Sequence, residues 1–305
     1  MDDVRGAWYQ MAFERDFHKK RGEEFQVFFW DLMSKAYPED FERVRPYGRL
    51  GDLKCDGYLR SGGIVFQVYA PWEIDLKALL KKIREDFEGA AEHWSGRMRA
   101  WIFVHNDDRG LPGPAVQLLL DLERDGVKTL TWSREELRRV VPMLSEEALV
   151  AQFGLAPSRR DFDSLGFDKL RVVLGVIGRA QPPDGIDIGP VPVGKLAANA
   201  LSSSVGLLLQ TGRQRERLVE DFLDKWHDPT LGDEIAAAFR MQYADLRARN
   251  LSPDRIFAEL QEFAGGTAFL EPDYQAAVLA VLAYLFDRCD IFEGPPLASA
   301  HDSAD

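Results

Sequence analysis

Apolar residues recur with helical spacing in two segments of the first half of the chain. In residues 17–37 they stand three or four positions apart, as on a helix with one buried stripe. Residues 75–94 repeat this pattern, and the other side of that helix carries Lys77, Lys81 and Arg84. We therefore predict two amphipathic helices. The basic stripe of the second is either a solvated face or a contact to a nucleic-acid backbone.

Alternation of apolar and polar positions predicts strands around these helices. The expected strands lie at residues 41–45, on both sides of a Ser-Gly-Gly turn within 51–71, at 97–105 and at 127–132. Further helices are expected at 114–124 and after Ser133, where Glu135 and Glu136 follow in the manner of a capping box. This order of elements predicts an α/β domain with a mixed sheet over residues 1–150.

The second half of the chain has a different character, because helical repeats follow one another without strands between them. Helices are expected at residues 165–179, 196–210, 213–226, 231–249, 253–263 and 273–287. The Pro- and Gly-rich segment 181–194 predicts a loop between the first two. We expect an all-α domain at residues 160–296, followed by a disordered tail at 297–305.

Composition narrows the class of protein without changing this division. A length of 305 residues is typical of two domains, and no apolar run approaches the roughly 18 residues of a membrane span. The start of the chain does not read as a signal peptide, so a cytoplasmic protein is expected. The two cysteines, Cys55 and Cys289, have no metal-ligand spacing, which argues against zinc and against a disulfide. With a net charge of -12, any contact to nucleic acid needs a locally basic surface or a metal.

Polar residues gather in the stretch GDLKCDGYLRSGGIVFQVYAP, residues 51–71. If its first half is a strand, Asp52, Lys54 and Asp56 share one face, because side chains alternate along a strand. On the second strand Gln67 and Tyr69 share a face. Pairing of the two strands across the turn then brings the five side chains to one patch.

Acidic and amide oxygens in one place suit a divalent metal, and Mg²⁺, with Mn²⁺ as its alternative, prefers such ligands. A metal of this kind stabilises charge on a phosphate and lowers the pKa of an attacking water. Asp56, Gln67, Asp52 and Glu24 are the expected ligands. The same charges also fit a solvated sheet face with surface ion pairs, each of which contributes little to stability.

The order of an acidic helix, a strand with Asp, a turn, and a strand with Glu or Gln, any residue and Lys resembles the restriction-endonuclease-like, or PD-(D/E)XK, nuclease fold. By this resemblance Asp56 is the metal-binding aspartate, Gln67 the Glu/Gln and Glu24 the acidic residue of the first helix. Tyr69 stands where the family has its lysine. A phenol with a pKa of about 10 is a poor base, so Lys54 is the expected substitute.

The helical half resembles the C-terminal domains of bacterial ABC-three-component conflict systems. The resemblance rests on short sequence motifs such as WHDP at 226–229 and AYLFDRCDIFE at 283–293. It implies a separately encoded ABC-type ATPase as partner and a role in defence against invading DNA. A separate ATPase agrees with the lack of a GxxxxGK[ST] phosphate loop in this sequence.

Together these patterns predict a metal-dependent nuclease effector of an anti-phage system, acting on DNA rather than RNA. The expected catalytic residues are Asp56, Gln67, Lys54, Tyr69 and Glu24. Two other functions remain open: the same fold without its lysine as a DNA-binding or ATPase-docking module, and a structural adaptor whose polar patch contacts protein. A homodimer also remains open.

Overall fold

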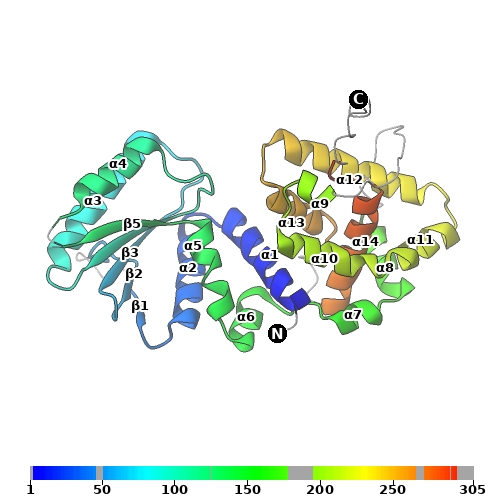
Figure 1. The fold of residues 1–305 in the computed structure, drawn as a ribbon, viewed down its shortest axis with the longest axis horizontal. Coiled ribbons are helices and arrows are strands. Elements are labelled where there is room, and N and C mark those ends of the chain that lie inside the picture. Colours follow the sequence, from blue (N-terminus) through cyan, green and yellow to red (C-terminus); the bar gives the residue numbers. More distant parts are fainter. Residues whose placement is uncertain are drawn as a thin grey trace, which may run out of the picture. The chain divides into compact units, whose positions relative to one another are not determined.

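The structure is a computed structural model that describes residues 3–45, 51–124, 126–177, 195–265, 271–288 and 290–293. The loop expected at 181–194, Cys289 and the expected tail at 297–305 lie outside the described residues. The chain divides into two compact units, one of residues 16–152 and one of residues 1–15 with 153–305 (Figure 1). The first 15 residues thus group with the helical half and not with the α/β half that follows them.

The unit of residues 16–152 contains the α/β part of the chain. Its helices are the end of α1 (Asp3–Lys19), α2 (Gly22–Ala36), α3 (Leu76–His93), α4 (Gly113–Leu122), α5 (Arg134–Arg138), the 3-10 helix η2 (Val141–Met143) and most of α6 (Glu146–Phe153). Its strands are β1 (Phe41–Arg43), β2 (Gly57–Leu59), β3 (Ile64–Tyr69), β4 (Ala100–His105) and β5 (Lys128–Trp132). The helices and strands predicted here are present, with two exceptions: residues 17–37 are divided between α1 and α2, and the strand before the Ser-Gly-Gly turn is shortened to Gly57–Leu59.

The strands form one mixed sheet in the order β1-β2-β3-β4-β5, which confirms the predicted mixed sheet. β1, β2 and β3 are antiparallel neighbours, whereas β3, β4 and β5 run parallel to one another. The predicted Ser-Gly-Gly turn joins β2 to β3. It requires glycine at Gly63, which has a φ of +59° and where an added Cβ would lie 2.6 Å from the Arg97 carbonyl oxygen.

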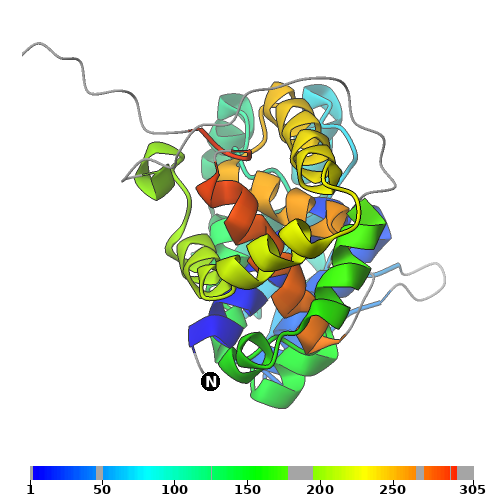
Figure 2. The ribbon, with the colours of Figure 1, turned by 90° about the vertical axis from the view of Figure 1, so that its right-hand side faces the viewer.

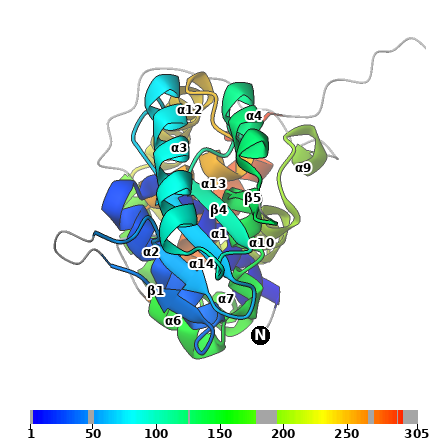
Figure 3. The same ribbon diagram turned by 90° about the vertical axis from the view of Figure 1, so that its left-hand side faces the viewer.

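Side chains of β3 alternate between two covered faces of the sheet. Val65 packs with Ile83 and Phe87 of α3 in a core that α4 also covers (Figure 3). Phe66 points the other way, where its ring meets those of Phe29 in α2 and Phe41 in β1. Gln67 has the parity of Val65 and so belongs to the face beneath α3. This placement puts the Gln67 side chain on the side of the sheet that α3 covers.

The first half of the stretch 51–71 is not the strand that its alternating charges predict. Residues 52–54 form a turn, Leu53 and Lys54 have φ values of 56° and 57°, and β2 begins only at Gly57. Asp52, Lys54 and Asp56 therefore do not line one face of a strand. A left-handed conformation costs a non-glycine residue about 1 kcal/mol or more, so contacts elsewhere must hold this turn.

The other unit is helical in all of its described parts. Besides the start of α1, its helices are α7 (Arg159–Asp163), α8 (Phe167–Ile177), α9 (Lys195–Ala198), α10 (Ser203–Arg213), α11 (Glu216–Lys225), α12 (Leu231–Ala248), α13 (Pro253–Phe263) and α14 (Pro272–Asp287). The all-α prediction is thus confirmed for the described residues. No helix among them is long and apolar enough to cross a membrane.

α14 is the central helix of this unit and lies among the others in Figure 2. It is apolar on nearly all sides, which is expected of a helix that neighbours surround. α10 approaches it most closely at Gly212, where an added Cβ would lie 2.4 Å from the Leu279 carbonyl oxygen. Even alanine at this position would force the two helices apart.

The acidic and apolar segment after α14 is held within the helical unit. Ile291 and Phe292 are buried, and buried Lys195 donates to the carbonyl oxygens of Phe286 and Ile291 at 2.6 and 2.7 Å. Three arginines pair with the acidic residues: Arg213 with Asp287, Arg240 with Asp290, and Arg247 with Glu293. The unusual composition of this segment is therefore explained by packing inside the unit.

Candidate functional site

Asp56 lies directly before β2 and is fixed there by its own backbone. Its N-H donates to the Phe66 carbonyl oxygen at 2.8 Å, and its carbonyl oxygen accepts from the Val44 N-H at 3.2 Å. The indole N-H of Trp30 in α2 donates to the same carbonyl oxygen. Asp56 thus extends β2 beside the C-terminal half of β3.

The carboxylate of Asp56 is buried, with 2% of the residue exposed, and it accepts hydrogen bonds from neutral groups. The side-chain amide of Gln67 and the backbone N-H of Val68 donate to Oδ2, both at 2.7 Å, and the amide of Gln26 donates to Oδ1. Burial, only partly offset by the Val68 hydrogen bond, raises the pKa of Asp56 to about 7. A carboxyl group that titrates near neutral pH inside a protein is a marker of functional sites.

Gln67 meets Asp56 as predicted, but with its NH₂ group and not with its oxygen. Its Oε1 is buried and has no hydrogen-bond partner among the residues that the structure describes, although only 3% of the residue is exposed. A buried amide oxygen without a partner costs free energy, about 1–3 kcal/mol. Such an atom in a native protein points to a water, an ion or a ligand that completes it.

Lys54 does not contact Asp56 or Gln67 through any bond in the described part of the chain. Its Nζ lies 2.9 Å from Oδ1 of Asp86, a fully buried residue of α3. Another lysine, Lys82 of α3, places its Nζ 2.6 Å from Oδ2 of the same carboxylate. The charges of Asp86 and Lys82 both act on the pKa of Asp56, so the three groups are electrostatic neighbours.

The turn at residues 52–54 is anchored on α3 and at its C-terminal end. The aliphatic chain of Lys54 lies against Gly89, where an added Cβ would stand 2.6 Å from its Cγ. Trp94 donates its indole N-H to the Leu53 carbonyl oxygen at 3.2 Å. Asp52 accepts the Lys54 backbone N-H at 2.9 Å and so closes the turn itself. These contacts explain how two non-glycine residues keep a left-handed conformation.

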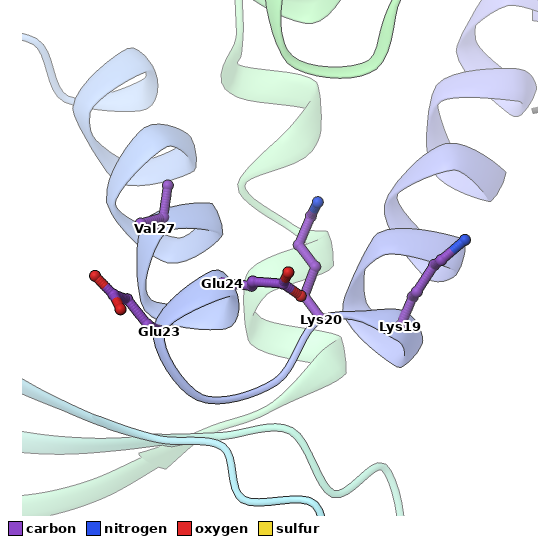
Figure 4. A pocket seen from close by; sticks show the side chains of 5 residues that line it. All are labelled: Lys19, Lys20, Glu23, Glu24 and Val27. Atoms are coloured by element: carbon purple, nitrogen blue, oxygen red, sulfur yellow. The ribbon is translucent and has the colours of Figure 1, made fainter.

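In the described part of the chain, no hydrogen bond joins the side chain of Tyr69 or Glu24 to the Asp56 carboxylate. Tyr69 ends β3 half-buried, with its ring centroid 5.9 Å from that of Phe103. Glu24 is exposed in the first turn of α2, and it stands two positions before Gln26, which places the two on opposite sides of the helix. Glu24 instead helps to line a shallow surface pocket. Figure 4 shows its five residues, Lys19, Lys20, Glu23, Glu24 and Val27.

The predicted basic stripe is present on α3. Lys77, Lys81 and Arg84 are all exposed there, and Lys81 pairs with Glu85 at 3.7 Å, one turn further along the helix. Their exposure fits both a solvated face and a contact to a phosphate backbone. The stripe therefore remains a prediction about function.

No group of three or more His, Cys, Asp or Glu side chains in the described ranges is placed to hold a metal ion. Of the four predicted ligands, Asp56 and Gln67 come together, whereas Asp52 closes its own turn and Glu24 lies on the outer side of α2. A site built on Asp56 and Gln67 would thus offer a carboxylate and an amide oxygen only.

Three residues around Asp56 were not predicted, although the sequence holds a signal for each. Gln26 stands four positions before Trp30, so both lie on one helix face, and both bind Asp56. Asp86 interrupts the apolar stripe of α3, a position where a carboxylate needs partners. Lys82, one turn before Asp86, is such a partner.

Comparison with known proteins gives a result for the helical unit alone. No curated protein and no solved structure matches the chain. The resemblance of the α/β unit to restriction-endonuclease-like proteins therefore stays a prediction. Residues 168–293 match the family model of C-terminal domain 10 of the ABC-three component (ABC-3C) systems. The helical domain of the chain is therefore similar to these C-terminal domains, as its sequence led us to expect.

Proposed function

We propose that the chain is the effector of an ABC-three-component defence system. In this proposal the helical domain binds an ABC-type ATPase encoded separately, and the α/β unit cleaves nucleic acid, DNA in the first place. The match over residues 168–293 supports the defence role and the ATPase partner. The lack of a phosphate-loop motif in this sequence agrees with a partner that supplies ATP hydrolysis.

The observation that carries the nuclease proposal is the pair of Asp56 and Gln67 at the β2–β3 junction. Both are buried polar residues, one with a pKa raised to about 7 and the other with an amide oxygen that lacks a partner. A structural hydrogen bond alone would explain the contact between them, but not the incomplete Gln67. Their order along the chain is also the order of the PD-(D/E)XK motif.

A divalent cation fits these two residues as a weak site that substrate completes. Mg²⁺ is usually held by one or two carboxylates together with phosphate oxygens and several waters. Asp56, and Gln67 through its partnerless Oε1, would hold it, and the ion would supply charge stabilisation at the scissile phosphate. A set of only two protein ligands implies low affinity without substrate.

The chain's own residues would prepare this site in three ways. Gln26 and the Val68 N-H orient the Asp56 carboxylate from both of its oxygens. Burial by α2 and the sheet keeps bulk water away from Asp56. Asp86 holds Lys54 and Lys82 on the α3 side of the sheet, where the charge of Lys82 favours the ionised form of Asp56.

A second function is favoured by the state of Lys54. Its ammonium is paired with Asp86, and Tyr69 occupies the place of the family's lysine, so no lysine stands next to Gln67 on β3. The α/β unit would then be a nucleic-acid-binding or ATPase-docking module without cleavage. Lys54 and Tyr69 are thus the residues on which the two proposals differ.

Cleavage assays with the full chain decide between them. Plasmid and single-stranded DNA are incubated with Mg²⁺ or Mn²⁺, with and without the partner ATPase, for the wild type and for Asp56→Asn. We expect the substitution to lower the cleavage rate by about 100-fold or more, because it removes the one carboxylate of the metal site. Equal rates in the two proteins, or no cleavage by either, would exclude the nuclease and favour the docking module.

A further inference from the structure

Two lysines share the single buried carboxylate of Asp86. Lys54 reaches it from the turn before β2 and Lys82 from one helical turn earlier on α3, at 2.9 and 2.6 Å. Their side chains keep 43% and 35% of their surface exposed, whereas that of Asp86 has none. Two cations on one anion leave positive charge at the surface beside Asp56.

The lysines also keep hydrogen-bond donors for a further group. An ammonium has three N-H donors and no acceptor, and a single hydrogen bond to Asp86 is formed by Lys54. Lys82 Nζ lies 2.6 Å from Asp86 Oδ2, so Lys82 too directs one N-H group to this carboxylate and keeps the others. Both ammonium groups are therefore half-exposed donors with capacity to spare.

The other carboxylates near the two lysines have contacts of their own. Glu85 pairs with Lys81 at 3.7 Å, and Asp52 accepts the backbone N-H of Lys54. Asp56 is surrounded by the amide donors described above. The charges of Asp52 and Glu85 also act on Lys54, so an anion would be bound here through direct contact with the two ammonium groups.

We propose that Lys54, Asp86 and Lys82 form a phosphate-binding site in which Asp86 holds the two lysines apart and in place. The phosphate would come from a nucleic-acid backbone or from a free phosphate ion. This inference rests on the proposed function only for its choice of nucleic acid as the ligand. Asp86 is the positioning residue of the site, and Lys82 places on α3 the positive charge that β3 lacks at Tyr69.

The lysine pair would offset the repulsion between a negatively charged protein and a nucleic acid. A protein with a net charge of -12 repels a polyanion, so binding requires a local cluster of cations. Lys82 stands about 100° around the helix from its neighbour Lys81. A strand that follows the exposed stripe of Lys77, Lys81 and Arg84 would pass next to it.

The test measures binding without cleavage, in EDTA, with the full chain and a fluorescent single-stranded 20-mer in an anisotropy titration. We expect Lys82→Ala to weaken binding about fivefold or more and to reduce the slope of log K against log salt by about 0.7, the value for one phosphate contact on a single strand. Lys82→Arg should retain both values, because it keeps the charge. Lys128→Ala is the matched control. It removes an exposed lysine from β5, an edge strand of the sheet, and should bind as the wild type does.

Binding by Lys82→Ala within twofold of the wild type, or an equal loss in Lys128→Ala, would overturn the proposal. If Lys82→Ala melts at a lower temperature, Lys82→Gln and Lys54→Gln are measured in its place and the same criterion applies to them. Displacement of the 20-mer by inorganic phosphate in the wild type identifies a site for the free ion, and lack of displacement identifies backbone phosphate. The Asp56→Asn cleavage assay is separate, so the nuclease can fail while this site stands, and the reverse.

Discussion

Asp56 and Asp290 are both buried aspartates, but they have different partners in the two units of the protein. Asp290 is paired with Arg240, and the neighbouring acidic residues Asp287 and Glu293 have arginines of their own. Asp56 is held by amides and a backbone N-H, and no cation contacts its carboxylate among the described residues. A buried carboxylate with an arginine is part of the packing of its unit. One with neutral donors only keeps an uncompensated charge that a cation or a proton can complete.

The largest expected effect concerns the proton on Asp56. Its pKa is 3.8 in the reference state and about 7 in the folded chain. Between these values the folded state binds more protons than the unfolded state, so the free energy of unfolding falls as the pH rises from about 4 to about 7. The full shift corresponds to about 4 kcal/mol, and the effect levels off above pH 7.

Chemical denaturation from pH 4 to 8 in metal-free buffer measures this dependence. Asp56→Asn should lose most of the fall in this window. Its carbonyl oxygen can keep the bonds from Gln67 and the Val68 N-H, and Gln26 can turn its amide so that Oε1 accepts from the new NH₂ group. Glu24→Gln, which removes an exposed carboxyl from the same unit, is the control. If the wild type and Asp56→Asn change in parallel with pH, the contrast between Asp56 and Asp290 is lost.

The next effect concerns the ion pair of the helical unit. Arg240→Ala leaves Asp290 buried without its cation, and breaking a buried pair by removing one partner costs about 3 kcal/mol. Arg247→Ala breaks a pair whose side chains are 48% and 65% exposed, so it should cost less than about 1 kcal/mol. Thermal unfolding followed by circular dichroism compares the two variants.

The double variant Arg240→Ala, Asp290→Asn should recover part of the lost stability, because no uncompensated charge remains. Equal melting temperatures for Arg240→Ala and Arg247→Ala would mean that burial does not distinguish these pairs. Asp290 would then be no reference for Asp56.

The smallest expected effect separates Gln26 from Glu24. Gln26→Ala removes a donor to the buried Asp56 carboxylate and should lower the free energy of unfolding by about 1 kcal/mol at pH 8. Glu24→Ala, on the exposed side of the same helix, should stay within about 0.5 kcal/mol of the wild type. Denaturant titrations of both variants measure the difference. A larger loss of unfolding free energy for Glu24→Ala than for Gln26→Ala would mean that Glu24 contributes to the site around Asp56.

The sequence determined the types of elements and the pairing at the centre of the site. The 3.6-residue repeat of apolar residues predicts α3, and the short apolar runs of β3 and β4 predict strands of a sheet that is covered on both faces. The meeting of Asp56 with Gln67 followed from a short turn between adjacent strands, which leaves little freedom of register.

Only the tertiary structure decided which other groups meet there. The alternating charges at 52, 54 and 56 predict a strand, yet the contacts of Lys54 with Asp86 and of Trp94 with Leu53 hold a left-handed turn. Local spacing could not show this, since α3 follows later in the chain and its position over the sheet depends on packing of Ile83 and Phe87 against Val65. Neighbours in sequence determine most of the local secondary structure, but the partner of a buried charge depends on which helix packs next to it.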